Sequence, residues 1–173
     1  MKKSVGLLLM VRMADGGIRA ILQRRGWWNH ETEKEESWRG SYQPTAHGGM
    51  EQNEIIDVAI ILREVAEEIG EVVALQLAIS IANENKLELL AETRNDEVWV
   101  TTYGIIMPME IIGKIRLGPS SGGIRPISTD EVRSIQSIEA GGYRKDDTLP
   151  ENRVIVMFDH NIRAVKQAFT VFM

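Results

Sequence analysis

Three glutamates, Glu64, Glu67 and Glu68, stand close together in the stretch REVAEEIG at residues 63–70. On a helix, offsets of 0, 3 and 4 place side chains on one face with Cβ atoms about 5 to 6 Å apart. Such like charges repel, and a solvated acidic surface is one explanation. The other is a site for Mg²⁺ or Mn²⁺, because these ions take oxygen ligands from carboxylates and phosphates. A bound ion of this kind neutralises a pyrophosphate and activates an attacking water molecule.

The apolar spacing around these glutamates predicts a helix from about Asn53 to Gly70. Apolar side chains at offsets 0, 3, 4, 7 and 11 form one stripe, the expected core face: Val58, Ile61, Leu62, Val65 and Ile69. The glutamates then emerge on another face. Gly70 fits the left-handed position that ends many helices. Gly48 and Gly49 allow a tight path of the chain before the helix begins.

The residues before this helix predict antiparallel strands. Residues 5–13 and 18–25 are β-prone and flank the turn sequence ADGG at 14–17, which favours a hairpin. The start of the chain has two lysines and an apolar run, but Arg12 interrupts the run and no cleavage site follows, so a core strand is favoured over a secretory signal. Residues 26–41 predict a long loop that is rich in charge and tryptophan.

The residues after the helix predict more sheet and a closing helix. We interpret two β-rich runs as long strands and a third, poorly alternating run as a weak strand: 72–82, 97–107 and 131–138. Helical spacing from about Val156 to Phe172 predicts the final helix. The breaker cluster at 118–123 is too short to separate two cored units, so one domain over residues 1–173 is expected.

Composition narrows the classes of function. The chain has 173 residues, 43% hydrophobic and 26% charged, which indicates a globular protein and neither disorder nor a membrane protein. A net charge of −5 disfavours a nucleic-acid binder, which needs a broad basic surface. The absence of cysteine rules out disulfides, thiolate zinc sites and a cysteine nucleophile, and fits a cytoplasmic protein.

Residues 63–70 match R-E-hydrophobic-x-E-E-x-G, and Gly49 precedes Arg63 by fourteen residues. This order resembles the signature of the Nudix hydrolases, G-x5-E-x7-R-E-hydrophobic-x-E-E-x-G-hydrophobic. The sequence of hairpin, signature helix, further sheet and final helix also resembles that family. The resemblance implies an α/β/α sandwich with a mixed central sheet. It also implies Mg²⁺-dependent or Mn²⁺-dependent hydrolysis of a small molecule, a nucleoside diphosphate linked to a group X.

The sequence departs from the family pattern at two places. Counting from Gly49 puts Ile55 at the first glutamate position, whereas counting from Gly48 puts Glu54 there with one residue too many before Arg63. We favour Glu54, with the extra residue absorbed as a π-type bulge in the helix. Glu71 stands where the family prefers an apolar residue. The displaced glutamate keeps open a second hypothesis, a non-catalytic nucleotide-sensing module on the same fold.

The resemblance also assigns roles to single residues. Glu64, Glu67 and Glu68 would bind the cation, with Arg63 holding a glutamate in place through its planar guanidinium. A backbone carbonyl at Gly48 is a further candidate ligand. The family commonly adds a later carboxylate, for which Glu131 is the candidate and Asp130 its competitor. The isopentenyl diphosphate isomerase branch of the family is disfavoured, because it uses a catalytic cysteine.

Substrate contacts are expected from the residues before the signature. Aromatic rings such as Trp28 and Tyr42 stack on a nucleobase in many proteins, although they equally cover the edge of a core. Arg39, like Arg24 and Arg25, is a candidate for phosphate contact. His47 is a candidate phosphate contact or a structural histidine. The resemblance is compatible with a homodimer.

Overall fold

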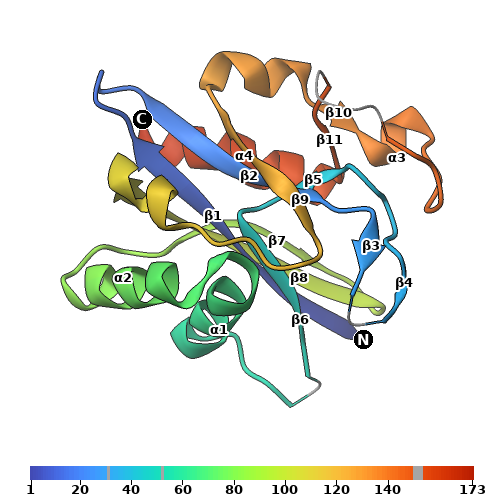
Figure 1. The fold of residues 1–173 in the computed structure, drawn as a ribbon, viewed down its shortest axis with the longest axis horizontal. Coiled ribbons are helices and arrows are strands. Elements are labelled where there is room, and N and C mark those ends of the chain that lie inside the picture. The colour runs from blue at the N-terminus through green and yellow to red at the C-terminus, as the bar shows by residue number, and fades with distance from the viewer. Residues whose placement is uncertain (31, 52, 150–153) are drawn as a thin grey trace.

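The computed structural model describes residues 1–30, 32–51, 53–149 and 154–173. Their main feature is a seven-stranded mixed sheet in which the strand order is β5-β2-β1-β8-β7, with β6 beside β1 and β9 beside β2 (Figure 1). The strands are β1 (Lys2–Arg12), β2 (Ile18–Arg25), β5 (Tyr42–Gln43), β6 (Ala46–Met50), β7 (Glu88–Arg94), β8 (Val98–Pro108) and β9 (Ser121–Ile127).

The central strand β1 has two different partners, β6 and β2, along the same edge. Residues 5–11 are all buried, as expected for a strand that is covered on both faces. The predicted hairpin is confirmed, since β1 pairs antiparallel with β2 around a turn in which Gly16 has a φ of 83°. Along one edge, β1 pairs with β6 through residues 3–7 and with β2 through residues 9–12. The two partners separate between these segments, and polar and charged side chains gather around this fork.

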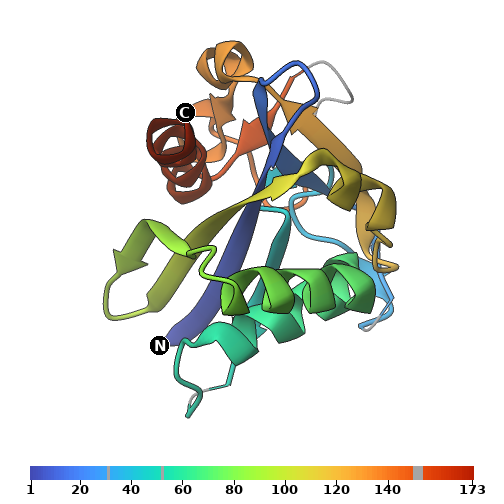
Figure 2. The ribbon, with the colours of Figure 1, turned by 90° about the vertical axis from the view of Figure 1, so that its left-hand side faces the viewer.

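Helices cover both faces of the sheet (Figures 1 and 2). On one face lie α1 (Val58–Ile69) and α2 (Glu71–Ala82), which share an apolar core with β1. On the other face α4 (Asp159–Phe172) packs on the second core, which includes Leu8, Met10 and Leu22. The expected α/β/α sandwich with a mixed sheet is therefore confirmed. No helix in the described ranges has the length and apolar character required to cross a membrane.

The predicted strand over residues 72–82 is wrong, because these residues form helix α2. Val73, Ala74 and Leu77 are the buried side chains, at helical spacing. The opposite side of α2 is also apolar, with Val72 and Leu75 exposed. Because apolar residues surround the helix, the 3.6-residue period is obscured. Gly70 joins the helices at φ 105° and ψ 147°, a positive-φ conformation outside the expected left-handed helical region.

Two further boundaries differ from the sequence prediction. Helix α1 begins at Val58 and not near residue 53, because the Asp57 side chain caps it by accepting a hydrogen bond from the Ile60 N–H at 2.9 Å. The predicted strand over 131–138 is wrong, because the 3-10 helix η2 (Thr129–Ser134) and the short strand β10 (Gln136–Ser137) occupy this stretch. An earlier 3-10 helix, η1 (Met109–Lys114), lies between β8 and β9. Helix α4 begins at Asp159, three residues later than expected.

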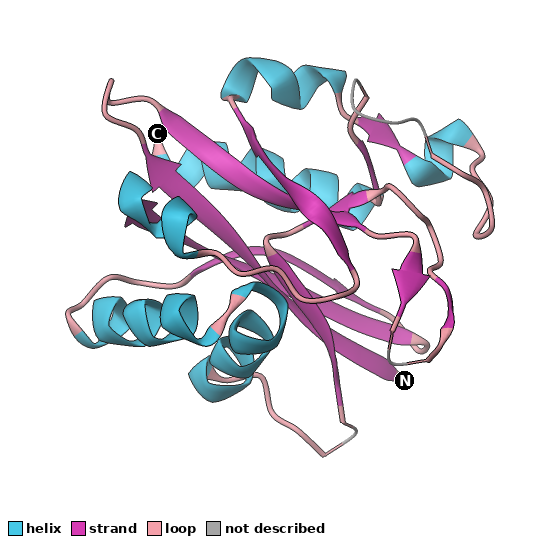
Figure 3. Ribbon diagram, in the orientation of Figure 1, coloured by secondary structure: helices cyan, strands magenta, loops and turns pink. Residues whose placement is uncertain are grey.

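The remaining elements are short and lie around the edge of the sheet (Figure 3). Within the predicted loop over 26–41, β3 (Trp28–Asn29) pairs with β4 (Lys34–Glu35). Near the C-terminus, α3 (Ile138–Gly141) follows β10, which pairs in parallel with β11 (Val156–Met157). These elements add small ribbons beside the main sheet.

Candidate active site

A polar cavity of about 540 Å³ opens beside α1, at the fork between β2 and β6. Its walls come from segments far apart in the sequence, which are the end of β2, the end of β3, β5, β6, α1 and the loop before β9. Helix α1 contributes all four polar residues of the signature: Arg63, Glu64, Glu67 and Glu68. The structure therefore brings the predicted charged residues to one cavity.

Glu64 points into the protein from α1 and is only 6% exposed. Its carboxylate lies directly on the backbone of Gly48 in β6. A Cβ atom at Gly48 would come within 1.4 Å of Glu64 Oε2, so this contact requires glycine. Burial raises the pKa of Glu64 above its usual value, against the lowering effect of the hydrogen bond from Arg63. Glu64 is thus a carboxylate with an unfavourable buried charge in a fixed position.

Arg63 holds the acidic residues around it. Its Nη2 atom donates to Glu64 Oε1 at 2.8 Å, and its Nη1 atom donates to Glu54 Oε1. Its Nε atom lies 3.9 Å from Glu67 Oε1. The hydrogen bond from Arg63 lowers the pKa of Glu54, and the same bonds to Glu54 and Glu64 raise the pKa of Arg63. The planar guanidinium therefore organises three carboxylates at once.

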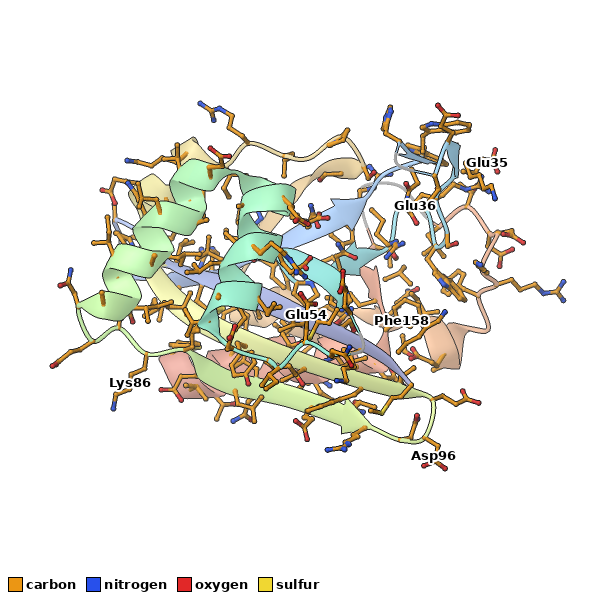
Figure 4. All side chains as sticks on the ribbon, turned by 90° about the horizontal axis from the view of Figure 1, so that it is seen from below. Glu35, Glu36, Glu54, Lys86, Asp96 and Phe158 are labelled. Carbon is orange, nitrogen blue, oxygen red and sulfur yellow. The ribbon has the colours of Figure 1, made fainter. Side chains whose placement is uncertain are left out.

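Glu54 and Ile55, the two candidates for the first glutamate position of the signature, differ in their surroundings. Glu54 is paired with Arg63 and lies beside α1 (Figure 4), whereas Ile55 is 78% exposed. The expected π-type bulge is wrong, because Glu54 precedes the helix. The additional residue lies in the irregular segment that leads to α1. Glu54 Oε2 also accepts a hydrogen bond from the Glu51 N–H at 2.7 Å, which ties this segment back on itself.

Glu68 is held by the sheet and not by Arg63. The Nε2 atom of Gln23 on β2 donates to Glu68 Oε2 at 2.9 Å. Glu67, one helical position earlier, is exposed. Among the residues with described positions, no three His, Asp or Glu side chains converge closely enough to form a metal centre in this arrangement. The carboxylates share one cavity, but Glu64 and Glu67 lie beside Arg63 whereas Glu68 is hydrogen-bonded to Gln23.

The donor set nevertheless fits a hard divalent cation. Carboxylates from α1 and from Glu51 line the cavity together with the backbone of Gly48 and Gly49, so its ligands would be oxygen atoms. A buried, ionised Glu64 also gains from a nearby positive charge beyond Arg63. Glu64, Glu67 and Glu68 are therefore the residues that would hold such an ion.

Three predicted residues lie elsewhere. The described residues that line this cavity or the second one do not include Glu131, Arg39 or Trp28. Glu131 forms a capping box with Ser128 at the start of η2 and pairs with Arg125 at 3.2 Å, so its carboxylate is engaged in local structure. Arg39 pairs with Glu35, and Trp28 is exposed on β3. All three side chains therefore lie outside the two cavities.

A second cavity of about 350 Å³ adjoins the first on the side of α4. The two cavities share Arg25, Gln43 and His47. Tyr42, which is buried, lines only the second cavity. Burial lowers the pKa of His47 to about 4, assisted by the positive charge of Arg25, so His47 is neutral at pH 7. His47 therefore stands between the cavities as an uncharged hydrogen-bonding group.

The second cavity has mainly apolar walls and neutral polar groups, with Arg25 and Glu139 as the charged residues of its lining. Val98, Val100 and Phe158 form part of its lining. His160 lies between two threonine hydroxyls at 2.9 Å, one on each ring nitrogen, and burial lowers its pKa to about 4. Ser41 Oγ is buried and has no hydrogen-bond partner within the described parts of the chain. This cavity suits an uncharged ligand group with hydrogen-bonding edges.

Sequence reasoning missed several residues of these cavities. Gln23 and Gln43 meet because β2 and β5 pair in a register that places them opposite each other. His160 and Asn161 reach the second cavity from the first turn of α4. No short motif marks these positions. For Gln23, the sequence did offer a clue. It is a polar residue two positions after Ile21, at a place where a buried strand would normally have an apolar side chain.

No protein-family model matches the chain, and no curated protein matches its sequence. Solved structures do match its fold. A mutT/nudix family protein from Listeria innocua superposes with a TM-score of 0.60 at 17% identity, over 98% of this chain and 92% of that chain. A structure of MutT, from work on Aliivibrio salmonicida and Vibrio cholerae, gives 0.54 at 15% identity, over 99% and 98%.

A third similar structure is the NUDIX domain of Shewanella oneidensis NrtR complexed with ADP ribose. Its TM-score is 0.54 at 15% identity, and the match covers 99% of this chain and 88% of that chain. All three superpositions span nearly the whole chain, from the first hairpin to the final helix, at identities too low to transfer an activity. The chain therefore has the Nudix fold.

Proposed function

We propose that the chain is a divalent-cation-dependent hydrolase that cleaves the diphosphate linkage of a nucleoside diphosphate joined to a group X. The observation that carries this proposal is the cavity beside α1, where Glu64 is buried against Gly48 and Arg63. If the glutamates formed only a solvated acidic face, they would stay exposed, because burying a carboxylate costs free energy. Glu64 is instead buried, and burial raises its pKa. The signature order of residues 63–70 and the Nudix fold support the same assignment.

The residues of the polar cavity divide the work of hydrolysis. Glu64, Glu67 and Glu68 hold Mg²⁺ or Mn²⁺, and Arg63 fixes Glu64. The ion, when bound, neutralises the diphosphate and makes a coordinated water more acidic. Water attacks one phosphorus atom, the bond from that atom to the bridging oxygen breaks, and a cavity carboxylate accepts the proton. Positioning and electrostatic stabilisation supply most of the rate gain.

The second cavity is the proposed location of the organic part of the substrate. It joins the polar cavity through Arg25, Gln43 and His47, so a ligand can extend from one to the other. Its mainly apolar lining, in which Arg25 and Glu139 are the charged residues, favours a ring system such as a nucleobase. The ADP ribose bound by the NrtR domain is an example of a ligand with both parts.

A panel of substrates tests the proposal. Nucleoside triphosphates, ADP-ribose, NADH, coenzyme A and sugar nucleotides are incubated with Mg²⁺ or Mn²⁺, and phosphate-containing products are separated by chromatography. We expect turnover of at least one compound, lost with chelator and lost in Glu68→Gln. A matched control is Glu71→Gln, which removes an exposed charge immediately after Gly70. Failure of every compound at high enzyme concentration contradicts the hydrolase assignment.

The second hypothesis is a nucleotide-sensing module without catalysis. Two observations favour it: Glu54 lies before the helix, and the three carboxylates do not converge as in a formed metal centre. A sensor would bind a nucleotide in calorimetry without consuming it. Turnover that is abolished in Glu68→Gln excludes this hypothesis, whereas tight binding with no turnover supports it.

The remaining features of the proposal concern partners and location. We propose one domain that acts on a small molecule in the cytoplasm, which fits the absence of cysteine. The net charge of −5 supports a small-molecule substrate over a nucleic acid. Sedimentation at several protein concentrations distinguishes a monomer from a homodimer.

A further inference from the structure

We propose that Gln23 and Gln43 are positioning residues that set the orientation of the Glu68 carboxylate for cation binding. The proposal rests on the function proposed above, because it concerns the same cation site. It adds two residues that no part of the signature includes, and they reach the site from the sheet. Both lie on paired strands, opposite each other in the register of β2 and β5.

Gln23 is a buried polar residue at the floor of the polar cavity. It is 1% exposed and lies two residues after Ile21, whose side chain belongs to the core under α1. Its Nε2 atom donates to Glu68 Oε2 at 2.9 Å. Its Oε1 atom accepts a hydrogen bond from Gln43 Nε2 at 2.7 Å. Both ends of the amide are therefore used, and one of them contacts a carboxylate of the signature.

The direction of this chain of hydrogen bonds is fixed by its two ends. Gln43 Oε1 accepts from Arg25 Nη1 at 3.3 Å, and a guanidinium can only donate. At the other end an ionised Glu68 can only accept. Each glutamine must therefore turn its amide nitrogen toward Glu68 and its oxygen toward Arg25. A flipped amide at either position would bring like groups together at both of its contacts.

Arg25 anchors the far end of the chain. It donates to Glu36, the residue after β4 (Figure 4), at 2.5 Å and to the Ser37 carbonyl at 3.0 Å. Burial raises the pKa of Glu36, but its interactions with Arg25 outweigh that effect and lower the pKa overall. The Glu36 carboxylate therefore stays ionised near neutral pH and holds the Arg25 guanidinium in place. A fixed donor holds Gln43, Gln43 holds Gln23, and Gln23 fixes the rotation of the Glu68 carboxylate.

The fold itself does not require these amides. Alternate positions of a buried strand are normally apolar, and leucine has nearly the volume of glutamine. Replacing a hydrogen-bonded buried group by an apolar one of similar shape is close to neutral when no partner is left buried and unpaired. Because Glu68 and Gln43 both line the polar cavity, water can replace their hydrogen bonds to Gln23. Loss of the amide should therefore affect the cation site more than stability.

The test is a titration of the full chain with Mn²⁺ alone, followed by electron paramagnetic resonance of the free ion. Partners that orient a metal ligand typically change metal affinity by 10- to 100-fold, so we expect about tenfold weaker binding in Gln23→Leu. Gln43→Leu, which acts only through Gln23, should weaken binding less, by about threefold. The control is Gln167→Leu, an exposed residue of α4, with unchanged affinity.

The outcomes separate this inference from the proposed function. Wild-type affinity in a folded Gln23→Leu protein overturns the positioning role and leaves the hydrolase proposal intact. If Gln23→Leu does not fold, the same measurement on Gln43→Leu decides, and unchanged affinity there overturns the inference. A wild-type protein that takes up no Mn²⁺, even with a nucleoside diphosphate present, overturns both. A weaker Mn²⁺ site together with a higher Mg²⁺ requirement for turnover supports the inference.

Discussion

The two adjoining cavities differ in the charge that they present. The cavity beside α1 is lined by Arg63 and several glutamates, whereas the cavity beside α4 has mainly apolar and neutral polar side chains, with Arg25 and Glu139 as its charged residues. One sheet supports both, because β2 and β6 separate beside β1 and expose polar residues between them. This difference is the basis of the proposed division of labour, in which cation chemistry belongs to the α1 cavity and recognition of the organic group to the other.

The largest expected effect comes from filling the space beneath Glu64. In Gly48→Ala the new Cβ atom would overlap Glu64 Oε2, so the carboxylate must leave its position. We expect turnover to fall by about a hundredfold or more, since several kcal/mol of charge stabilisation depend on the cation site. The measurement is kcat/KM on the best substrate of the panel at saturating Mg²⁺.

Gly49→Ala is the matched control for that substitution. No heavy atom lies within 4 Å of a Cβ added at Gly49, and its φ is not in the positive range. The loss of activity should be several-fold at most. Equal losses in the two variants would show that any change in this strand is harmful, and the specific role of the Gly48 contact would be refuted.

A smaller effect is expected in the second cavity. Asn161 is buried at the start of α4 and lines this cavity only. Replacing it in Asn161→Leu removes a polar group from the proposed contact with the organic part of the substrate. We expect KM to rise about tenfold, the cost of one hydrogen bond, with kcat nearly unchanged.

The separation of kcat from KM is the critical observation for that variant. If Asn161→Leu lowers kcat as strongly as Gly48→Ala does, the two cavities do not have separate roles. Thermal unfolding of the variant serves as the stability control. A substrate that lacks the nucleoside, such as inorganic pyrophosphate, should be insensitive to Asn161→Leu wherever it is turned over.

The sequence predicted the residues of the cavity beside α1 better than those of the cavity beside α4. Helix α1 was predictable because its apolar residues form a narrow stripe and its glutamates share another face. The hairpin was predictable from its turn residues. Helix α2 was not, because apolar residues on all its sides hide the period. The start of α1 was predicted too early, since the cap at Asp57 was not recognised.

Residues that become neighbours only in the folded chain could not be predicted from sequence patterns. Gln23 and Gln43 are twenty residues apart, and only the pairing of β2 with β5 makes them neighbours. His160 reaches the second cavity from a helix more than a hundred residues after His47. Glu131 was predicted from the resemblance, because its segment is similar to the region where the family supplies a later carboxylate. In the structure this residue takes part in a local capping box, which uses the same residue type.

The neutral histidines predict how stability depends on pH. Both His47 and His160 have pKa values of about 4 in the folded protein, below the ordinary value of 6.5. The unfolded chain therefore binds protons first, and stability present above pH 6.5 is lost as the pH falls toward 4. We expect the unfolding midpoint to drop by several degrees over this range in cation-free buffer. His160→Gln should reduce the slope, and an unchanged slope would contradict the assignment for that residue.

The smallest expected effect concerns Glu131. Its carboxylate accepts hydrogen bonds from the Ser128 N–H and from Arg125, which lower its pKa despite the opposing effect of burial. Glu131→Ala should therefore cost about 1 kcal/mol of stability through loss of the cap, measured by urea unfolding. Because Glu131 lines neither cavity, kcat and the Mg²⁺ requirement should not change. Asp130→Ala, at the exposed neighbouring position, is the control for stability. If Glu131→Ala needed more Mg²⁺ for turnover and Asp130→Ala did not, Glu131 would be a cation ligand after all. The cation site would then include a residue outside the α1 cavity.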